Sequence, residues 1–568
     1  MARTVAIGQQ DFETIRRENY FYIDKTEFIR EWWESGDSVT LITRPRRFGK
    51  TLNMNMLDKF FSVRYAGRSD LFMGLSIWEN EKYRALQGSY PVISLSFASV
   101  KENSFSNAKR KICQLIANLY SENRFLIDGD ILDNREKEYF ERVSPDMEET
   151  DATFALHQLS RFMARYYGKK VIILLDEYDT PMQEAYINGY WQELTGFTRS
   201  LFNAAFKSNE HLERAVMTGI TRVSKESIFS DLNNLKVVTT TSEEYAECFG
   251  FTQQEVLEAL QECGLAEHLQ DVRIWYDGFT FGKKEDIYNP WSIINYLDTG
   301  VLAPYWANTS SNGLVSKLLR EGSPEIKNSF ERLLQGKTVV TRLEEQIVYE
   351  QLDYNGQAIW SLLLASGYLK VARLHTVPSV FGFSEYEYEL QLTNLEVRLM
   401  FANMIRGWFG KASNDYNDFI KALLQSDVKA MNIYMNRVAL TVFSYFDTGK
   451  NPSHEEPERF YHGFVLGLLV ELAERYVITS NRESGFGRYD VMLEPRLAKD
   501  DAIVLEFKVH DEGAEQTMQD TVDQALEQIE KKKYDVMLKE KGIAEQRIRK
   551  YGFAFSGKKV LIGGKFPA

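Results

Sequence analysis

The sequence predicts an α/β protein: a parallel sheet with helices in the first part, a mainly helical middle region, and a second α/β domain at the end. Three observations lead to this fold class. Short apolar runs alternate with amphipathic helical patterns between Val39 and about Val237, which is typical of a parallel sheet. Helical patterns prevail over residues 241–450. After a loop near residue 450, helices and strands alternate again.

In the first part, the apolar runs indicate four strands and the patterns between them indicate helices. Strands are expected at residues 39–42, 90–97, 170–175 and 215–218, and helices at 52–61, 107–122 and 153–167. Ligands of open parallel sheets bind outside the carboxyl ends of the strands. The residues that follow each strand are therefore the first candidates for a site.

The first strand is followed by eight residues that form the most informative stretch of the chain: Arg44, Pro45, Arg46, Arg47, Phe48, Gly49, Lys50 and Thr51. Strand, loop and helix in this order are typical of a P-loop NTPase, whose backbone N–H groups converge on phosphates. Lys50 would reach the β- and γ-phosphates, and the Thr51 hydroxyl would hold Mg²⁺. Arg44 replaces the usual first glycine. We expect the whole loop to bind ATP.

Polar residues also follow two other predicted strands. Asp176 and Glu177 follow a buried strand, where Asp176 would bind Mg²⁺ through its water shell and Glu177 would polarise the attacking water as general base. Thr218 ends a further strand, and Arg222 lies four residues later. A hydroxyl beside the γ-phosphate and an arginine that stabilises transferring charge both serve phosphoryl transfer. A turn residue and a surface arginine are the alternative interpretation.

Four segments of this half resemble one family when taken together. Residues 21–26 read FYIDKT, residues 44–51 RPRRFGKT, residues 175–179 LDEYD and residues 275–278 WYDG. In this order they resemble the AAA-ATPase-like family of prokaryotic proteins, which is related to archaeal-type and STAND P-loop ATPases. The resemblance covers roughly residues 5–310. It implies an ATPase in which Arg44 is tolerated in place of glycine.

The last part of the chain carries a second candidate site. The patterns predict a helix at residues 458–474, strands at 476–480, 487–493 and 502–509, a helix at 517–538 and a strand at 551–555. Residues two apart on a strand face the same side, so Glu506 and Lys508 point together while Phe507 faces a core. If the strands pair, Asp490 joins them. Asp490 and Glu506 would bind Mg²⁺ or Mn²⁺, and Lys508 would orient the nucleophile or balance developing charge in phosphodiester hydrolysis.

This order of elements resembles the PD-(D/E)xK nuclease core, and the resemblance implies that the helix after Lys508 supports the site. Gln524 and Gln528 share one face of that helix, and Gln528 is the preferred candidate. Glu471, on the preceding helix, is a candidate additional acid. Tyr489 stands where the family usually has proline before the first acid.

Composition limits the function classes. The formal net charge is −13, which argues against a protein that coats nucleic acid over its whole surface. Residues 531–568 nevertheless contain 11 Lys/Arg against 3 Asp/Glu. This basic segment fits either a nucleic-acid contact or a solvated helix end. No apolar run approaches the roughly 20 residues of a membrane span. The polar start is too short for a secretory signal. Three widely spaced cysteines indicate reduced thiols, so we expect a cytoplasmic protein.

The sequence as a whole predicts four regions: an ATPase domain (1–240), a helical and aromatic extension (241–320), a middle module (321–450) and a nuclease-like domain (451–568). Within the middle module, residues 345–409 fit either a winged helix or a packing module. The leading hypothesis is an ATPase coupled to a metal-dependent nuclease that cleaves DNA or RNA, in defence against mobile elements. The alternative is an ATP-dependent signalling or DNA-binding switch whose nuclease-like domain does not cleave. The sequence does not determine the oligomeric state, and a homo-oligomer is one possibility.

Overall fold

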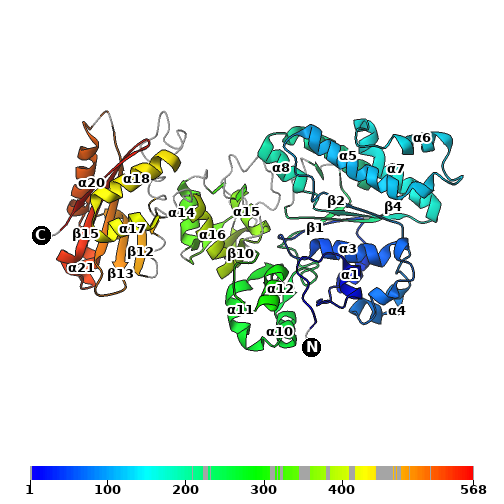
Figure 1. Ribbon diagram of the computed structural model, residues 1–568, viewed down its shortest axis with the longest axis horizontal. Helices are drawn as coiled ribbons and strands as arrows, with labels where there is room; N and C mark the ends of the chain where they lie inside the picture. The colour runs from blue at the N-terminus through cyan, green and yellow to red at the C-terminus, as the bar shows by residue number, and fades with distance from the viewer. Residues whose placement is uncertain are drawn as a thin grey trace. The chain divides into compact units, whose positions relative to one another are not determined.

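The chain folds into two compact units, shown in a computed structural model (Figure 1). The first unit comprises Met1–Glu321 with Arg332–Leu399, and the second comprises Gly322–Glu331 with Met400–Ala568. The structure describes residues 3–207, 209–221, 228–229, 232–306, 314–315, 318–319, 324–334, 336–343, 358–378, 384–408, 416–442, 465, 468–469, 472, 475–484, 487–511, 513 and 515–566.

The first unit begins with an alternation of helices and strands, as the sequence predicts. Its elements are α1 (Phe12–Arg17), α2 (Glu27–Ser35), β1 (Val39–Thr43), α3 (Lys50–Phe61), α4 (Glu81–Arg84), β2 (Val92–Ser96), α5 (Phe105–Glu122), α6 (Asn134–Arg142), α7 (Glu149–Tyr167), β3 (Val171–Asp176), α8 (Thr180–Asn188), α9 (Trp191–Phe202), β4 (Leu212–Gly219) and β5 (Leu235–Val238).

Five of these strands form one parallel sheet in the order β2-β3-β4-β1-β5. Figure 1 shows α5 and α7 on one face of the sheet and α3 on the other. The strand order places β4 between β1 and β3, so the carboxyl ends of these three strands are neighbours. The sheet thereby brings together the phosphate-binding loop and the polar residues that follow β3 and β4.

Apolar side chains of the strands and of the helices that cover the sheet form its core. Every residue of β1 and β3 is buried. The amphipathic helices α5 and α7 bury Ile112, Ile116, Leu156 and Leu159 against it. Burying each such side chain contributes about 1.5–3 kcal/mol. This core keeps the strand ends, and the polar residues on them, in fixed positions.

The extension and the middle region complete the first unit and contribute part of the second. They contain β6 (Phe251–Thr252), α10 (Gln253–Glu262), α11 (Leu269–Tyr276), β7 (Phe279–Phe281), β8 (Lys284–Tyr288), α12 (Pro290–Thr299), α14 (Pro324–Leu334), β9 (Val339–Thr341), α15 (Ala358–Ala365), β10 (Leu369–Pro378), β11 (Ser384–Leu392) and α16 (Leu395–Trp408). The strands form two antiparallel sheets, β6-β8-β7 and β10-β11-β9. Residues 344–357 lie outside the described residues, so a winged helix at 345–409 stays a prediction.

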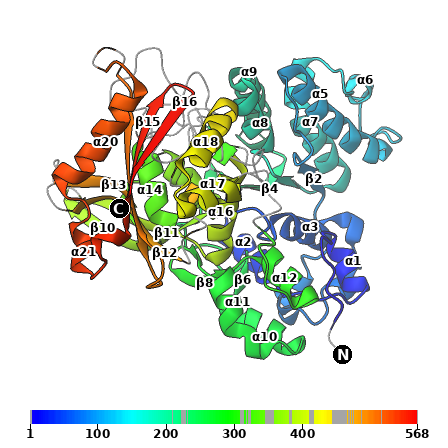
Figure 2. The ribbon, with the colours of Figure 1, turned by 60° about the vertical axis from the view of Figure 1, so that its left-hand side comes forward.

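The second unit is built on a mixed five-stranded sheet. It contains α17 (Tyr416–Gln425), α18 (Val428–Val442), β12 (Tyr476–Ser484), β13 (Gly487–Pro495), β14 (Ala502–Val509), α20 (Met518–Lys532), α21 (Val536–Glu540), β15 (Ile548–Ser556) and β16 (Lys559–Lys565). The strands lie in chain order; β14 and β15 are parallel, and the other neighbours are antiparallel. Figure 2 shows α20 on one face of this sheet and α17 with α18 on the other.

The helix predicted at residues 517–538 is interrupted. The Thr517 hydroxyl caps its start, and the helix ends before Lys533, whose φ of 52° lies in the left-handed region. The chain then turns Tyr534 and Asp535 into the interior, where Asp535 accepts a hydrogen bond of 2.9 Å from the buried ammonium of Lys550. The sequence pattern did not indicate this break, because the charged run before it continues a helical periodicity.

Two expectations from composition concern the molecule as a whole. In the part of the chain that the structure describes, no helix has the length and apolar character needed to cross a membrane. The three cysteines are free thiols; Cys113 and Cys248 are buried and Cys263 is partly buried.

Candidate nucleotide and nuclease sites

The loop between β1 and α3 has the backbone of a phosphate-binding loop. Gly49 has a φ of 80° and Arg47 a φ of 66°, both left-handed, and these values turn the chain into α3 at Lys50. No side chain caps the start of α3. The N–H groups of a first helical turn without a side-chain cap attract anions, and the helix dipole adds to this attraction. The loop therefore fits a phosphate group.

Inside the loop, the Lys50 ammonium donates to the backbone carbonyls of Arg44 (2.9 Å) and Pro45 (2.8 Å). Burial lowers the pKa of Lys50, and the nearby carboxylates of Glu177 and Asp176 oppose this decrease. Two neutral carbonyls are weak partners for a buried ammonium compared with an anion. This environment favours an anionic ligand next to Lys50.

Asp176 connects the loop to the ends of two strands. Its carboxylate accepts a hydrogen bond of 2.8 Å from the Thr51 hydroxyl and another from the Thr218 hydroxyl. Burial raises the pKa of Asp176, and the hydrogen bonds from Thr218 and Thr51 oppose this increase. Hydroxyl and carboxylate oxygens are the ligands that Mg²⁺ prefers, so Thr51 and Asp176 fit a magnesium ion. The three side chains come from three separate sequence motifs.

Asp179 is a site-forming residue to which the sequence pattern assigned no role. Its carboxylate accepts hydrogen bonds from the backbone N–H groups of Ile220 (2.9 Å) and Thr221 (2.8 Å), and from the Thr221 hydroxyl (2.8 Å). Glu177 lies two residues earlier with a left-handed φ of 51°, and its carboxylate accepts a hydrogen bond of 3.0 Å from the Thr180 hydroxyl. Asp179 thus ties the loop after β3 to the loop after β4.

Arg44, which replaces the usual glycine, is fully buried. Its φ is not left-handed, so this position does not need glycine. The guanidinium points away from the phosphate side of the loop. It donates to the backbone carbonyls of Thr239 (2.7 Å) and Glu244 (3.1 Å), and it lies 4.5 Å from the centre of the Phe281 ring. Burial lowers the pKa of Arg44 to about 10, so the group stays charged at neutral pH. The side chain fastens the loop to the segment after β5.

The aromatic extension supports the loop from outside. Phe48 packs edge-to-face on Phe279, with 4.7 Å between the ring centroids. The guanidinium of Arg47 lies 4.4 Å from the centre of the Trp291 ring. Asn289 caps α12 with its side-chain oxygen, and its amide donates to the backbone carbonyl of Arg46 at 3.4 Å. The conformation of the loop therefore depends on residues more than 200 positions away in the sequence.

Two predicted site residues, Arg222 and Glu471, lie outside the described residues. Their proposed roles stay predictions.

In the second unit, the three predicted nuclease residues come from two neighbouring strands. Met492 lies opposite Val504 in the antiparallel register of β13 and β14. Residues two apart share a face, so Asp490 and Glu506 lie on that same face, the face that α20 covers. Phe507 points into the opposite core, as the sequence predicts.

The electrostatic surroundings of Asp490 agree with this placement. Its carboxylate accepts a hydrogen bond of 2.7 Å from the backbone N–H of Phe507. Burial raises the pKa of Asp490 to about 6, while the Phe507 N–H and the charge of Lys508 oppose this increase. A carboxylate that is disfavoured by burial gains from a nearby cation.

Of the two candidate glutamines on α20, Gln528 contacts the acids. Its amide donates to the Glu506 carboxylate and, at 3.1 Å, to the Tyr534 hydroxyl, whereas Gln524 is exposed. Glycine at position 552, directly opposite Glu506 in β15, makes this approach possible. A Cβ there would lie 2.8 Å from the backbone carbonyl oxygen of Val522 in α20. No sequence pattern indicates the contact of Tyr534 with this site, because only the helix break turns its side chain inward.

Asp490 and Glu506 fit a hard divalent cation, since Mg²⁺ is commonly held by one or two protein carboxylates with water and phosphate oxygens. Across the described residues, no cluster of three or more Asp, Glu, His or Cys side chains has the geometry of a metal site. A cation at these two carboxylates would therefore take its other ligands from water and substrate.

The basic residues of the last segment are mostly engaged within the unit. Seven of the 11 Lys and Arg residues at positions 531–568 form ion pairs with Asp or Glu: Lys531, Lys539, Lys541, Arg547, Arg549, Lys550 and Lys565. Most of the positive charge that the sequence shows in this segment is therefore balanced by Asp and Glu residues of the same unit.

The parallel sheet, its phosphate-binding loop and the Thr51–Asp176–Thr218 cluster define the first half as a P-loop nucleotide-binding fold. The mixed sheet with acids on two neighbouring strands defines a nuclease-type fold in the second unit. Comparisons with known proteins agree with both assignments. Residues 6–229 match the family model "Predicted AAA-ATPase", and residues 456–565 match the PD-(D/E)XK nuclease superfamily. Both resemblances predicted from the motifs are confirmed.

One relative from the curated proteins is similar over most of the chain. It is an uncharacterized protein in the vnfD 5' region of Azotobacter chroococcum mcd 1. It is 28% identical over 400 residues, which cover 70% of this chain and 68% of the relative. The similarity therefore extends beyond the ATPase-like region.

Proposed function

We propose that this protein binds and hydrolyses ATP and couples this activity to metal-dependent cleavage of DNA or RNA phosphodiester bonds. The observation that carries the proposal is that each unit places side-chain oxygens that suit a divalent cation on or beside neighbouring strands of its sheet. In the first unit Asp176 lies between the hydroxyls of Thr51 and Thr218. In the second, Asp490 and Glu506 share the face of the sheet that α20 covers.

In the nucleotide site, the residues divide the work of phosphoryl transfer. The loop N–H groups and Lys50 bind the phosphates, and Thr51 with Asp176 would hold Mg²⁺, which neutralises charge that develops on the phosphate oxygens. Glu177 orients and polarises the attacking water. Thr218, near the end of β4, donates a hydrogen bond to the Asp176 carboxylate and would stand next to the reacting phosphate.

In the nuclease-like site, Asp490 and Glu506 would hold Mg²⁺ or Mn²⁺, which lowers the pKa of bound water and stabilises negative charge on the phosphate. Lys508 lies on the same side of β14 as Glu506 and supplies positive charge to the phosphate that is cleaved. Gln528 holds the Glu506 carboxylate in one orientation. A nucleic acid is the partner that this set of groups fits.

The ATPase part is tested by phosphate release. We expect the wild-type protein to release phosphate from ATP in Mg²⁺, and Lys50→Ala and Asp176→Ala to abolish it. Glu177→Gln should keep ATP binding and reduce turnover by about 100-fold or more, since it removes general-base catalysis. Phosphate release that survives Lys50→Ala or Asp176→Ala would contradict the proposal.

The nuclease part is tested on single- and double-stranded DNA and RNA, with Mg²⁺ or Mn²⁺, with and without ATP. We expect cleavage by the wild-type protein, and none by Glu506→Ala or Lys508→Ala. If the wild-type protein leaves every substrate intact in both ions, the nuclease proposal is wrong. A role in defence against mobile elements, which we propose as the biological setting, predicts that expression lowers phage plaque numbers for wild type but not for Glu506→Ala. Equal plaque numbers would contradict it.

The second candidate function is an ATP-dependent switch whose nuclease-like domain binds a partner without cleaving it. Internal pairing of most basic residues in the last segment favours this alternative, because nucleic-acid affinity depends on cations that contact phosphates. The same substrates distinguish the two: binding that is retained in Glu506→Ala, without cleavage by wild type, supports the switch.

A further inference from the structure

Glu177 has a backbone conformation that a glutamate seldom adopts. Its φ of 51° lies in the left-handed region, where the Cβ crowds the neighbouring peptide group. A residue keeps such a conformation only where the surrounding structure holds it. The side chain of Glu177 is partly exposed, whereas its neighbours Asp176, Tyr178 and Asp179 are buried. The contacts of these buried neighbours are therefore what holds the turn.

The loop after β4 contacts the residues on both sides of Glu177. On one side, the Asp176 carboxylate accepts a hydrogen bond from the Thr218 hydroxyl. On the other side, the Tyr178 N–H donates to the Thr218 carbonyl at 3.0 Å, and the Tyr178 hydroxyl donates to the Thr221 carbonyl at 2.8 Å. Backbone and side-chain contacts thus fix the chain directly before and directly after the left-handed residue.

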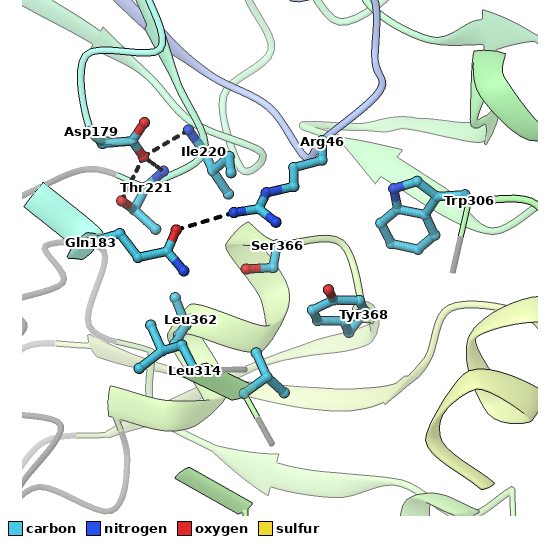
Figure 3. A pocket seen from close by; sticks show the side chains of 11 residues that line it. Arg46, Asp179, Gln183, Ile220, Thr221, Trp306, Leu314, Leu362, Ser366 and Tyr368 are labelled. Atoms are coloured by element: carbon cyan, nitrogen blue, oxygen red, sulfur yellow. Dashed lines mark hydrogen bonds between the residues drawn. The ribbon is translucent and has the colours of Figure 1, made fainter. Parts of the chain in front are cut away.

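Asp179 makes the most contacts with this loop. Its buried carboxylate accepts hydrogen bonds from the Ile220 N–H (2.9 Å), the Thr221 N–H (2.8 Å) and the Thr221 hydroxyl (2.8 Å), as Figure 3 shows. Hydrogen bonds to a charged acceptor are stronger than those between neutral groups. The backbone carbonyl of Asp179 also accepts a hydrogen bond of 3.0 Å from the Gln183 N–H, because Asp179 precedes the first residue of α8. Asp179 therefore fixes the point at which the turn ends and α8 begins.

The next residue of the chain connects this point to the carboxylate of Glu177. The Thr180 hydroxyl donates a hydrogen bond of 3.0 Å to that carboxylate, and the Thr180 N–H donates to the Glu177 carbonyl at 3.2 Å. Since Thr180 follows Asp179 directly, a shift of Asp179 moves Thr180 and turns the Glu177 carboxylate. Misplacement of a reacting group by about 1 Å can cost a factor of about 100 in rate.

We propose that Asp179 is a positioning residue of the ATP site, which holds the turn that directs the Glu177 carboxylate at the attacking water. This role rests on the proposed ATP hydrolysis with Glu177 as general base. The phosphates are bound by the loop N–H groups and Lys50, which lie on other elements. Loss of the Asp179 carboxylate should therefore slow the chemical step and leave nucleotide affinity unchanged.

The test is a double-mutant cycle on the full chain. It measures single-turnover phosphate release from ATP in Mg²⁺ with the protein in excess, and ADP affinity by titration calorimetry. We expect Asp179→Ala to slow phosphate release about 10- to 100-fold and to leave ADP affinity unchanged. In protein that already carries Glu177→Gln, the same change should slow release by less than about 2-fold, because residues that act as one unit are not additive.

Two milder variants keep more of the contacts. Asp179→Asn retains a side-chain oxygen that can accept from the Ile220 and Thr221 N–H groups, so it should recover part of the rate. Tyr178→Phe removes one hydroxyl and keeps the ring. It should slow release about 2- to 10-fold in wild type, the value of one hydrogen bond, and by less than about 2-fold in Glu177→Gln. If Asp179→Ala does not fold, Tyr178→Phe decides by the same comparison.

Asp24→Ala is the matched control. The Asp24 carboxylate accepts hydrogen bonds from the Thr26 N–H (2.8 Å), the Thr26 hydroxyl (2.7 Å) and the Ser76 N–H (2.7 Å). These donors are of the same kinds as those of Asp179, but they do not belong to the loops after β1, β3 and β4. Asp24→Ala should lower the melting temperature and leave phosphate release unchanged. A loss of rate as large as that of Asp179→Ala would overturn the proposed role.

The cycle also separates the role of Asp179 from the ATP site itself. If Glu177→Gln slows wild-type hydrolysis but Asp179→Ala slows release equally with and without Glu177, the ATP site stands and Asp179 does not act through Glu177. Weaker ADP binding in Asp179→Ala, by the same factor as its loss of rate, would have the same meaning. If wild type does not hydrolyse ATP, or Glu177→Gln keeps the full rate, the proposed hydrolysis with this base is wrong, and the role of Asp179 is refuted with it.

Discussion

Gly219, the last residue of β4, offers a direct test of how the nucleotide site is held together. A Cβ at this position would lie 2.7 Å from a carboxylate oxygen of Asp179 and 2.7 Å from the Tyr178 ring. Both neighbours are held in place. Asp179 accepts three hydrogen bonds from the loop after β4, and the Tyr178 hydroxyl donates a hydrogen bond of 2.8 Å to the Thr221 carbonyl. Gly219→Ala therefore forces apart the loops after β3 and β4.

The size of the effect follows from this geometry. The φ of Gly219 is not left-handed, so alanine adds a collision and no backbone strain. Overpacking of this kind costs about 1–3 kcal/mol. If displacement of Asp176 and Glu177 relieves the collision, the activation free energy of ATP hydrolysis rises by the same amount, about 1–3 kcal/mol. ATP turnover then falls about 5- to 150-fold.

The assay is steady-state phosphate release, with ADP affinity as the second readout. Turnover should fall while ADP binding changes little, because the loop N–H groups and Lys50 are not displaced. Gly196→Ala is the matched control, since this glycine lies in the middle of α9 with no atom within 4 Å of the added Cβ. It should leave turnover unchanged and stabilise the helix by about 0.5–1 kcal/mol. Equal turnover in wild type and Gly219→Ala would show that the contacts of Asp179 and Tyr178 with the loop after β4 do not position the nucleotide site.

Three further predictions concern other parts of the molecule. Gly367→Ala, with a left-handed φ of 82° and a Cβ that would lie 2.8 Å from Pro45, should weaken ATP binding about 5-fold or more in a nucleotide titration; unchanged affinity would show that the turn does not support the loop. Gln528→Leu should weaken Mn²⁺ binding about 10-fold in calorimetry, because it frees the carboxylate of Glu506, while Gln524→Leu should not; equal effects would contradict this. Burial raises the pKa of Asp58 to about 6, so its contribution to stability is full below pH 4 and is lost as pH rises through 6. Asp58→Asn should therefore raise the free energy of unfolding in urea by about 1–3 kcal/mol at pH 8 and by little at pH 4, and an equal gain at both would be inconsistent.

The sequence was sufficient to predict the elements that have strong periodicity or a motif with a mechanism. The buried strands β1 and β3, the helices α5 and α7, and the strands that carry Asp490 and Glu506 all follow from local patterns. The contact between the phosphate-binding loop and Asp176 was also predictable, because a P-loop is typically paired with an acidic residue at the end of a neighbouring strand.

The remaining features depend on contacts between distant residues. No local pattern shows that the Arg44 side chain turns toward Thr239 and Phe281, since these residues meet it only in the folded sheet. The short edge strand β5 is partly exposed and mixes polar with apolar residues, so its sequence shows no clear strand pattern. The helix break at Lys533 is accompanied by the ion pair between Asp535 and Lys550, which lie 15 residues apart in the sequence.

The proposed function requires that one chain carries a working ATP site and a working nuclease site that are coupled. The most direct measurement is the rate of nucleic-acid cleavage in Mg²⁺ or Mn²⁺ as a function of ATP, for wild type, Lys50→Ala and Glu506→Ala. We expect that cleavage by wild type changes with ATP, that Lys50→Ala removes this dependence, and that Glu506→Ala abolishes cleavage while ATP hydrolysis persists. Cleavage that is independent of ATP in wild type, or that persists in Glu506→Ala, would contradict it.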